Sequence, residues 1–471
     1  MSKHQPADLA ALSKDSTKIP ALAVRTLTVR RGRRDVLRNV TFTVQPGERI
    51  AIIGSNGSGK TTLLRTIAGL LRPRTGNVHI NGVPATSSDS GIRKTVGFLG
   101  HRPHLYPYLT ARENLQIQAR LFGVQNPDLR IDTTLSTVGL ATSADRPVRE
   151  FSRGMQQRLG LGLAMLHSPS VLLLDEPDAG LDPEAIENLP EMISRLCPHS
   201  AVMFSTHDER VVTALADQVG RVAQGRVSLP NQDVKETEPS LAREWPDQIG
   251  FVAATTTLIV KDIRTEWRAR EQVPTLLIFT MLIALVFDMA FIAIIESEAA
   301  AVATGLLWTS VLLAATLGGT KLFAAEQERG TLDGLLLAPI DPSSIYVAKF
   351  CVLSIETFLV GAMQLGFISL LLNVPLLQGA TIGVLALSTT AISAVIALHS
   401  SLIINARARE LLMPLLSIPI AIPVVLAGVG ATLATLEVTP AAQQWPWFGL
   451  LAITTAVFLS VGVVLYPYTT K

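Results

Sequence analysis

The stretch that decides the fold is Arg49-Ile50-Ala51-Ile52-Ile53-Gly54-Ser55-Asn56-Gly57-Ser58-Gly59-Lys60-Thr61-Thr62. Its apolar beginning predicts a β-strand, and the apolar run of residues 63–70 that follows predicts a helix. Between them lies the pattern G-x-x-x-x-G-K-T, the phosphate-binding P-loop sequence, in the strand–loop–helix context that it requires. The stretch therefore predicts an α/β domain that binds a nucleoside triphosphate.

The backbone and the side chains of the P-loop are expected to share the binding of ATP. Glycines let the N–H groups curl around the phosphates, and the N-terminus of the next helix adds the positive end of its dipole. Lys60 supplies a charge to the β- and γ-phosphates, and the hydroxyl of Thr61 can ligate Mg²⁺. The candidate ATP ligands are Gly54, Ser55, Asn56, Gly57, Ser58, Gly59, Lys60, Thr61 and Thr62.

The composition divides the chain into two unlike halves. Of the 471 residues, 48% are hydrophobic and 17% are charged; the sequence is charged up to about Glu244, and long apolar stretches begin after about Pro274. A soluble half followed by a membrane half explains this pattern. The net charge of +2 predicts no nucleic-acid partner. Cys197 and Cys351 lie in different halves, which argues against a disulfide framework and fits a reducing cytoplasm around the soluble half.

A second acidic motif follows the apolar run Val171-Leu172-Leu173-Leu174. Asp175 and Glu176 come directly after this run, so they are expected at the end of a buried strand, on the ligand edge of the sheet. Asp175 would hold Mg²⁺ through water, and Glu176 would polarise the attacking water. An apolar run ending in two acids is common by itself, and its position downstream of a P-loop supports this interpretation.

At Phe151-Ser152-Arg153-Gly154-Met155-Gln156-Gln157-Arg158 the sequence resembles the ABC ATPase family, whose signature is usually L-S-G-G-Q followed by Q-R and a helix. Arg153 and Met155 stand where the family prefers Gly and Gln. The resemblance implies that Ser152 and the N–H of Gly154 bind the γ-phosphate of ATP held on an opposite chain. The chain has one P-loop and one signature (Ser152, Arg153, Gly154, Met155), so a homodimer is expected.

Two further segments match that family by position. Ala179-Gly180-Leu181-Asp182 resembles the D-loop, with Asp182 as its acid. Ser205-Thr206-His207-Asp208 follows an apolar run and resembles the switch segment. The resemblance implies that His207 contacts the γ-phosphate and supports Glu176.

The sequence departs from the family at two positions. An aromatic residue commonly stacks on adenine near Arg31, but this chain has none there, so weak adenine binding is expected. His101 stands where the family often has the Q-loop glutamine, which links Mg²⁺ to the membrane domain. His101 is expected to take that role, with a plain loop histidine as the alternative.

Six apolar stretches in the second half are each long enough to cross about 30 Å of hydrocarbon. They cover residues 274–295, 301–320, 345–372, 380–404, 412–436 and 447–466. Lys and Arg residues fall on one side of this six-span path, and the opposite loops carry Glu296, Glu298 and Glu437 instead. By the positive-inside rule, the ATPase half and both termini are expected on the cytoplasmic side of the inner (cytoplasmic) membrane.

These patterns divide the chain into four parts. Residues 1–21 are expected to be a disordered leader, 22–229 the ABC ATP-binding domain, 230–260 a linker, and 261–471 an all-α transmembrane domain. Residues 261–270 form a basic, amphipathic segment that is expected at the membrane surface, with a solvated helix as the alternative. Residues 326–341 are too polar to span a membrane and too apolar for a free loop. A short amphipathic helix docked on the ATPase half would explain them.

The segments 326–341 and 407–416 also resemble the membrane B subunit of the cytochrome c maturation heme exporter. The similarity covers most of residues 261–471, and residues 22–229 resemble that system's ATP-binding A subunit. The resemblance implies a single-chain fusion of the two subunits. It also implies, as partners, the heme-handling C and D subunits, the heme chaperone and membrane lipid.

Several alternatives remain open at this point. Asp288 and Glu356 fall inside expected spans and could line a substrate or proton path or make interhelical hydrogen bonds. His399 could ligate heme iron or be a packing histidine. The main hypothesis is that the protein is an ATPase that exports heme or releases heme-loaded chaperone. The rivals are an exporter of a lipid, drug or polysaccharide, and a catalytically silent regulator.

Overall fold

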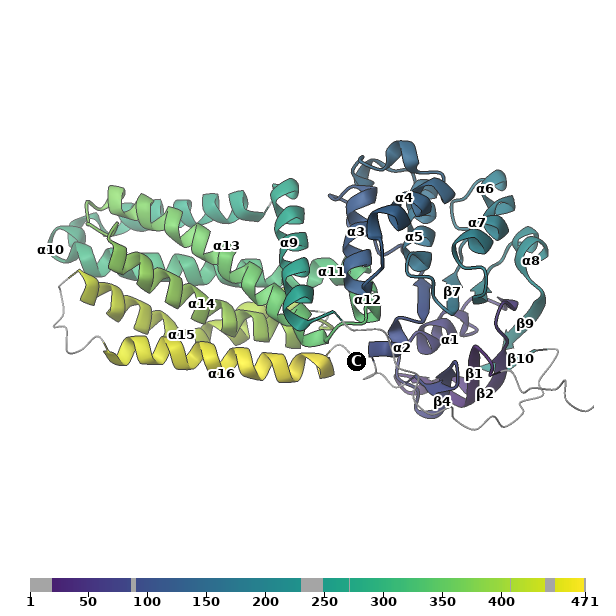
Figure 1. The fold of residues 1–471 in the computed structure, drawn as a ribbon. Helices are drawn as coiled ribbons and strands as arrows, with labels where there is room; N and C mark the ends of the chain where they lie inside the picture. The colour runs from purple at the N-terminus through teal and green to yellow at the C-terminus, as the bar shows by residue number, and fades with distance from the viewer. Residues whose placement is uncertain are drawn as a thin grey trace, which may run out of the picture.

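The computed structural model describes residues 19–85, 90–229, 249–270, 272–406, 408–436 and 445–469. Most of the expected leader (1–21) and much of the expected linker (230–260) therefore lie outside the described residues, as do Arg407 and Glu437 of the topology argument. In the described part, an α/β domain lies at one end of a bundle of long helices (Figure 1). The predicted fold class is confirmed.

The larger sheet of the α/β domain contains β3 (Arg49–Ile53), β6 (Val96–Leu99), β7 (Val171–Asp175), β8 (Ala201–Ser205), β9 (Gln218–Ala223) and β10 (Arg226–Ser228). Their order is β10-β9-β3-β8-β7-β6, and all pairs are parallel except β10 with β9. β7 and β8 are buried along their whole length, as expected for apolar strands in the middle of a parallel sheet. The P-loop and the Asp175 motif therefore end on the same edge.

A smaller antiparallel sheet contains β1 (Leu22–Arg31), β2 (Arg34–Val44), β4 (Thr75–Ile80) and β5 (Val83–Pro84). Its order is β2-β1-β4-β5. β1 and β2 form a hairpin that turns at Gly32, whose φ of 58° favours glycine. This hairpin carries Arg31, the position where an adenine-stacking aromatic residue is missing.

The helices of the α/β domain are α1 (Lys60–Ile67), α2 (Ser90–Arg93), α3 (Ala111–Phe122), α4 (Pro127–Thr137), α5 (Arg153–Met165), α6 (Pro183–Glu187), α7 (Leu189–Leu196) and α8 (Glu209–Leu215). Short sequence signals determine where several of them begin. α3 starts with a capping box in which Thr110 and Glu113 bond each other's backbone N–H groups. α5 starts at the signature, with Ser152 as its N-cap.

The helical half contains α9 (Phe251–Ala269), α10 (Gln272–Leu322), α11 (Ala324–Arg329), α12 (Thr331–Leu337), α13 (Pro342–Leu371), α14 (Gly379–Leu402), α15 (Arg409–Thr435) and α16 (Trp445–Thr469). Among the described residues, six segments are long and apolar enough to cross a membrane. They are Gln272–Met289, Glu298–Arg329, Pro342–Leu371, Gly379–Leu402, Arg409–Thr435 and Pro446–Thr469. The prediction of six spans is confirmed.

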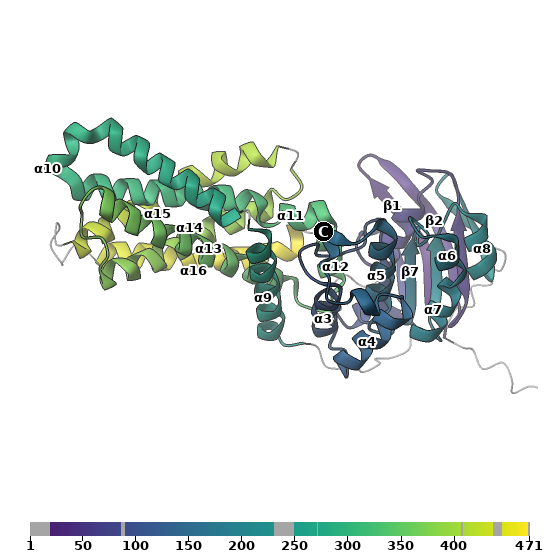
Figure 2. The same ribbon diagram turned by 90° about the horizontal axis from the view of Figure 1, so that it is seen from above.

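The connection between the first two spans differs from the expectation. The sequence predicts separate stretches at 274–295 and 301–320, whereas α10 stays helical from Gln272 to Leu322. Figure 2 shows α10 doubling back at its far end, so that it supplies two antiparallel segments. The connecting sequence Glu-Ser-Glu-Ala-Ala-Ala-Val-Ala at 296–303 explains the continuity, because it is rich in strong helix formers.

α9 lies across the ends of the membrane helices, between the bundle and the α/β domain (Figures 1 and 2). It contacts α13 of the bundle and α3 of the α/β domain. It begins at Phe251, ten residues before the start at 261 expected for the membrane half. Intrinsic propensity does not predict a helix here, because the three threonines at 255–257 are β-branched and favour strands.

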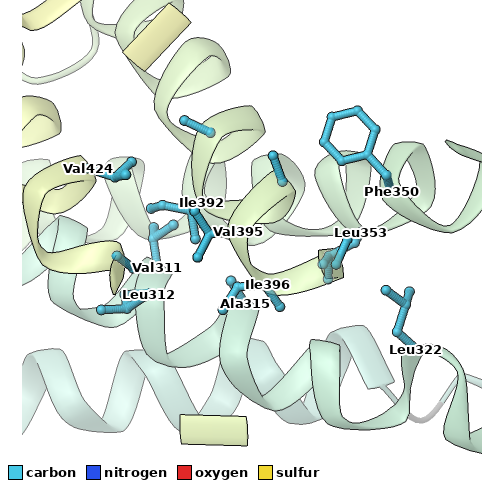
Figure 3. Close-up of a cluster of buried hydrophobic side chains, with 14 of the residues drawn as sticks. Val311, Leu312, Ala315, Leu322, Phe350, Leu353, Ile392, Val395, Ile396 and Val424 are labelled. Carbon is cyan, nitrogen blue, oxygen red and sulfur yellow. The ribbon is translucent and has the colours of Figure 1, made fainter. Parts of the chain in front are cut away.

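The core of the bundle lies where the second segment of α10 meets α13 and α14. Figure 3 shows Val311, Leu353 and Ile396 pointing into this cluster, and all three are buried. A Cβ at Gly319 would lie 2.3 Å from Cγ2 of Ile396, so the close approach of α10 and α14 requires glycine there. Trp308 is fully buried, and its Nε1 donates to Thr432 of α15 at 3.0 Å. These contacts hold four membrane helices together at the centre.

Candidate ATP site and its link to the membrane helices

The P-loop has the backbone that its glycines allow. Gly57 and Gly59 have φ values of 76° and 114°, a backbone region that residues with a Cβ rarely adopt. A Cβ at Gly54 would lie 2.5 Å from the carbonyl oxygen of Val222 on β9. The tight loop therefore delivers the chain directly into the N-terminus of α1, where backbone N–H groups can bind phosphate.

Lys60 is the first residue of α1 and is only 7% exposed. Its Nζ donates to the carbonyl oxygens of Gly54 at 2.7 Å and Ser55 at 3.3 Å, and it lies 3.3 Å from Nε2 of His207. The ammonium group is thus held inside the loop by backbone carbonyl oxygens. Thr61 is exposed, and Thr62 is buried.

The two acids of the second motif have different surroundings. Asp175 is 2% exposed, and its Oδ1 accepts a hydrogen bond of 2.6 Å from the hydroxyl of Ser205 on β8. The backbone N–H of Glu176 donates to the carbonyl oxygen of Ser205 at 3.1 Å. Glu176 has a φ of 54°, an uncommon value for a non-glycine residue. The strained backbone turns the Glu176 side chain out of the strand direction and into the site.

The carboxylate of Glu176 lies between two histidines. His101 Nδ1 is 3.2 Å from its Oε2, and His207 Nε2 is 3.8 Å from its Oε1. The sequence placed both histidines near the phosphates but did not foresee a contact between His101 and Glu176. A continuous chain of neighbouring groups therefore runs from the P-loop to the His101 loop, through Lys60, His207, Glu176 and His101.

Ser205 and Gln157 are site residues that the sequence argument missed. Gln157 donates from Nε2 to the carbonyl oxygens of Glu176 at 3.0 Å and Pro177 at 3.2 Å. It therefore ties the signature helix α5 to the turn that carries Glu176. Gln157 belongs to the signature segment and Ser205 to the switch segment. A sequence pattern does not reveal hydrogen bonds between segments that are distant in the chain.

The signature segment contacts the D-loop of its own chain. Ser152 accepts at Oγ from the N–H of Met155 at 3.3 Å, as an N-cap. A Cβ at Gly154 would lie 2.7 Å from the carbonyl oxygen of Gly180, so this contact requires glycine. Asp182 accepts at Oδ1 from the N–H of Ala185 at 2.8 Å and caps α6. Arg153 is exposed.

The polar segment 326–341 contains α11 and α12, and α12 docks on the α/β domain. Leu337 is buried in the same apolar cluster as Leu63, Leu64 and Ile67 of α1. A Cβ at Gly334 would lie 3.0 Å from Cβ of His104, so the helix lies directly on that side chain. Burial lowers the pKa of His104 to about 4, which keeps it neutral in this contact. The docking helix expected from the sequence is confirmed.

Arginines of the α/β domain clamp this segment. Arg65 pairs end-on with Asp333, with Nη1–Oδ2 at 2.7 Å and Nη2–Oδ1 at 3.1 Å. Arg93 donates from Nη1 to the carbonyl oxygens of Leu336, Ala338 and Ile340 at 3.1–3.2 Å. These carbonyls lie at and beyond the C-terminus of α12, where a cation satisfies unpaired acceptors. Arg102, next to His101, donates to the carbonyl oxygen of Glu328.

A charge cluster of Lys261, Asp262, Glu326 and Lys349 joins α9, α11 and α13. Glu326 Oε1 lies 2.6 Å from Nζ of Lys261 and 3.0 Å from Nζ of Lys349. Asp262 Oδ1 lies 2.8 Å and 3.1 Å from the same two nitrogens. The two lysine side chains are 1% and 7% exposed. Burial opposes the charge on Lys261, but the neighbouring carboxylates of Asp262 and Glu326 raise its pKa above the ordinary value, so Lys261 stays charged.

Glu356 and His399, left open by the sequence, have protein neighbours. Glu356 accepts at Oε2 from Nε2 of Gln272 at 3.1 Å, which is an interhelical hydrogen bond between α13 and α10. The ring of His399 lies 6.5 Å from that of Phe458 on α16. Among the described residues, no group of three or more His, Cys, Asp or Glu side chains has the arrangement of a metal site.

Comparison with known families agrees with this architecture. Residues 37–179 match the family model of ABC transporters, and residues 253–470 match the family model of the CcmB protein. The fold and the site define an ABC-type ATP hydrolase attached to a multi-pass membrane domain. The chain belongs to the ABC transporter family, and it joins a CcmA-like ATPase to a CcmB-like membrane domain. Members of this family generally dimerise.

Individual relatives cover the ATPase half. The cytochrome c biogenesis ATP-binding export protein CcmA of Bordetella bronchiseptica is 39% identical over 177 residues, covering 37% of this chain and 79% of that protein. The ABC transporter ATP-binding protein YdbJ of Bacillus subtilis is 37% identical, covering 49% and 76%. The lantibiotic transport ATP-binding protein SrtF of Streptococcus pyogenes is 34% identical, covering 45% and 90%. A solved ATP binding subunit of an ABC transporter covers 44% and 88% at 32% identity, with a TM-score of 0.42.

Proposed function

We propose that the chain is one half of a homodimeric ABC transporter complex in cytochrome c maturation. Its ATP hydrolysis would drive either the export of heme or the release of heme-loaded chaperone. The observation that carries this proposal is the pairing, in one chain, of a CcmA-like ATPase half with a CcmB-type membrane domain. The proposed division keeps an ATPase domain of 22–229 and begins the membrane half with α9 at Phe251 rather than at 261.

The proposed roles of the site residues follow from their positions. Lys60 and the N-terminus of α1 would bind the phosphates, and Glu176 would polarise water for attack on the γ-phosphate. His207, 3.8 Å from Glu176, would support that carboxylate. Ser152, Arg153, Gly154 and Met155 would meet the nucleotide of the other chain, and Asp182 would stand at the junction between the chains.

Mg²⁺ is a proposed cofactor of this site. Hard oxygen donors suit this ion, and the hydroxyl of Thr61 and the carboxylate of Asp175 supply such donors beside the P-loop. When bound, Mg²⁺ would neutralise charge that develops on the phosphates. Ser205 bonds one oxygen of Asp175 at 2.6 Å and so orients the other one. His101 contacts Glu176, and this contact favours an action on that carboxylate over the Mg²⁺ role expected from the sequence.

The proposed topology places the ATPase domain and both termini on the cytoplasmic side of the inner membrane. Arg329 lies over the ring of Tyr108 in the ATPase domain, and Lys349 pairs with Asp262 of α9, the helix that contacts α3 of that domain. Lys321 lies in the last turn of α10, just before α11. These positions agree with the positive-inside rule. Glu298 lies at the start of the second span, toward the other end. Cysteine labelling at Glu298 from outside, and at Arg329 only after permeabilisation, would support this orientation.

The main rival is export of another compound. The similarity to SrtF, a lantibiotic transport protein, shows that the ATPase half alone does not identify a substrate. The proposed partners are the heme-handling C-type and D-type membrane subunits and the heme chaperone, with membrane lipid around the bundle. Co-purification with the chain would test them directly.

Deletion of the chain tests the proposal. Covalent c-type cytochromes, detected by heme stain, should disappear, and b-type cytochromes should remain. Normal c-type cytochromes would exclude the heme role and favour the rival exporter. A Lys60→Ala strain separates the two mechanisms: heme-loaded chaperone should accumulate if ATP drives release, whereas empty chaperone would indicate heme translocation.

A further inference from the structure

Helix α1, which follows the P-loop, also reaches the membrane domain. α1 has eight residues; Lys60 begins it and Arg65 lies in its last turn. Five residues of α-helix advance about 7.5 Å and rotate about 140°, so Arg65 projects from a different face and further along the helix than Lys60. One short helix therefore carries a phosphate-binding group at one end and a membrane-domain contact at the other.

The contact of Arg65 with Asp333 has the features of a stiff connection. Both nitrogens of the guanidinium fork meet both carboxylate oxygens, at 2.7 and 3.1 Å, and such pairs fix orientation as well as distance. The side chains are 27% and 24% exposed, so water competes only in part. Leu337, one turn further along α12, is buried among apolar residues of α1. α12 is thus held by α1 through both charge and apolar packing.

α12 is in turn connected to the membrane helices. It follows α11 after Gly330, and Thr331 donates from its hydroxyl to Glu326 of α11. Glu326 is part of the charge cluster and bonds Lys261 of α9 and Lys349 of α13. The Arg65–Asp333 pair, the short helix α12 and the Thr331–Glu326 hydrogen bond therefore connect α1 to α11, and the charge cluster connects α11 to α9 and α13.

The loop that contains His101 makes further contacts with the same segment, and its His104 lies against Gly334 of α12. Arg102 reaches only the backbone carbonyl of Glu328, and this contact is exposed. Arg65 pairs with a side chain on α12 itself, in a half-buried setting. The side-chain ion pair between Arg65 and Asp333 thus joins α12 to the P-loop helix, while the His101 loop meets the same segment through a backbone contact and the packing of His104.

We propose that Arg65 and Asp333 are positioning residues that couple phosphate occupancy of the P-loop to the membrane helices through α1. This coupling requires only ATP binding by the chain, so it stands apart from the heme role. Loss of the pair should leave nucleotide binding intact and uncouple the membrane half from it.

Hydrogen exchange of the full chain in lipid nanodiscs tests the pair. The measurement is the change in exchange at 331–345 on adding a non-hydrolysable ATP analogue. Asp333→Asn should reduce this change at least threefold, while the KM for ATP stays within twofold of wild type. The charge-swapped variant Arg65→Asp/Asp333→Arg should restore it, because the same fork geometry is rebuilt. Asp132→Asn, which breaks the Arg112–Asp132 pair within the ATPase domain, is the matched control and should change nothing.

Three results would overturn the proposal. The first is a full ATP-dependent change at 331–345 in Asp333→Asn. The second is a loss of that change which the charge swap does not restore, although its melting temperature equals that of wild type. Arg65→Lys covers the case in which the swap does not fold. It keeps the charge but loses the fork, and it should retain an intermediate response; a response no larger than that of Asp333→Asn would also contradict the proposal.

Discussion

His101 Nδ1 lies 3.2 Å from Oε2 of Glu176, so the loop that faces the membrane domain contacts the carboxylate proposed to activate water. His101→Gln should keep a hydrogen-bond donor at this point and retain most ATPase activity. His101→Ala should lower kcat by about a hundredfold, the low end of the contribution of a group that assists proton transfer, with little change in KM. A steady-state ATPase assay of both variants measures these changes in kcat and KM. Equal kcat for Ala and wild type would mean that His101 is a plain loop residue.

The charge cluster should be sensitive to the loss of one member. Glu326 is nearly fully buried and lies 2.6 and 3.0 Å from Nζ of Lys261 and Lys349, so Glu326→Gln leaves two buried lysines that share the one carboxylate of Asp262. Breaking such a pair costs about 3–5 kcal/mol. The double variant Glu326→Gln/Lys349→Gln should recover part of this loss, because it removes one charge of each sign. Thermal unfolding in detergent measures both effects.

The control for that experiment is an exposed ion pair. Glu191 and Arg195 lie 2.8 Å apart with side chains 61% and 65% exposed, so Glu191→Gln should cost no more than about 1 kcal/mol. A Glu326→Gln variant as stable as Glu191→Gln would show that the cluster does not hold α9, α11 and α13 together.

The contact of α3 with α9 should weaken in acid. Burial raises the pKa of Glu113, but hydrogen bonds from Arg268 at 2.6 and 2.9 Å and from the N–H of Thr110 lower it further, to a value below the ordinary 4.5. A depressed pKa means that the stabilisation is complete above pH 4.5 and is lost as the pH falls through the lower, folded-state value.

Glu113→Gln should therefore remove a stabilisation of no more than about 1 kcal/mol at pH 7 and should flatten the acid side of the stability profile. Gln can still close the capping box, so helix α3 itself should survive the change. Melting temperatures of wild type and Glu113→Gln from pH 7 to pH 3.5 make the comparison. Parallel curves across this range would argue against the proposed contribution.

The dimer should be trapped by a disulfide between the P-loop of one chain and the signature of the other. Ser58→Cys with Arg153→Cys is the suitable pair, because Arg153 is exposed whereas a Cβ at Gly154 would lie 2.7 Å from the carbonyl oxygen of Gly180. Cross-linked dimers should form with ATP in a Glu176→Gln background and run at twice the monomer mass. An active monomer in single-particle mass measurement would contradict the proposal.

The sequence predicted those features that depend on local patterns. The P-loop, the strand before Asp175 and the six apolar spans follow from short-range periodicity and glycine placement. The docking of α12 could be foreseen as well, because the segment 326–341 is neither apolar enough to span nor polar enough for a loop.

Contacts between distant segments could not be foreseen. Lys261 and Glu326 are 65 residues apart in the chain, and Arg65 and Asp333 are 268 apart. Many lysines and acids in the sequence could have paired, and only the fold selects these. The start of α9 was also missed, because ten of its residues resemble a linker until α13 and α3 pack against them.

The most direct test of the central claim is complementation of a strain that lacks this chain. Glu176→Gln and wild type would be expressed at equal levels, and c-type cytochromes would be measured by heme stain. The account predicts that wild type restores them, and that Glu176→Gln, which should bind ATP but hydrolyse it poorly, does not, with b-type cytochromes intact in both. Full restoration by Glu176→Gln, or c-type cytochromes that persist in the deletion strain itself, would contradict it.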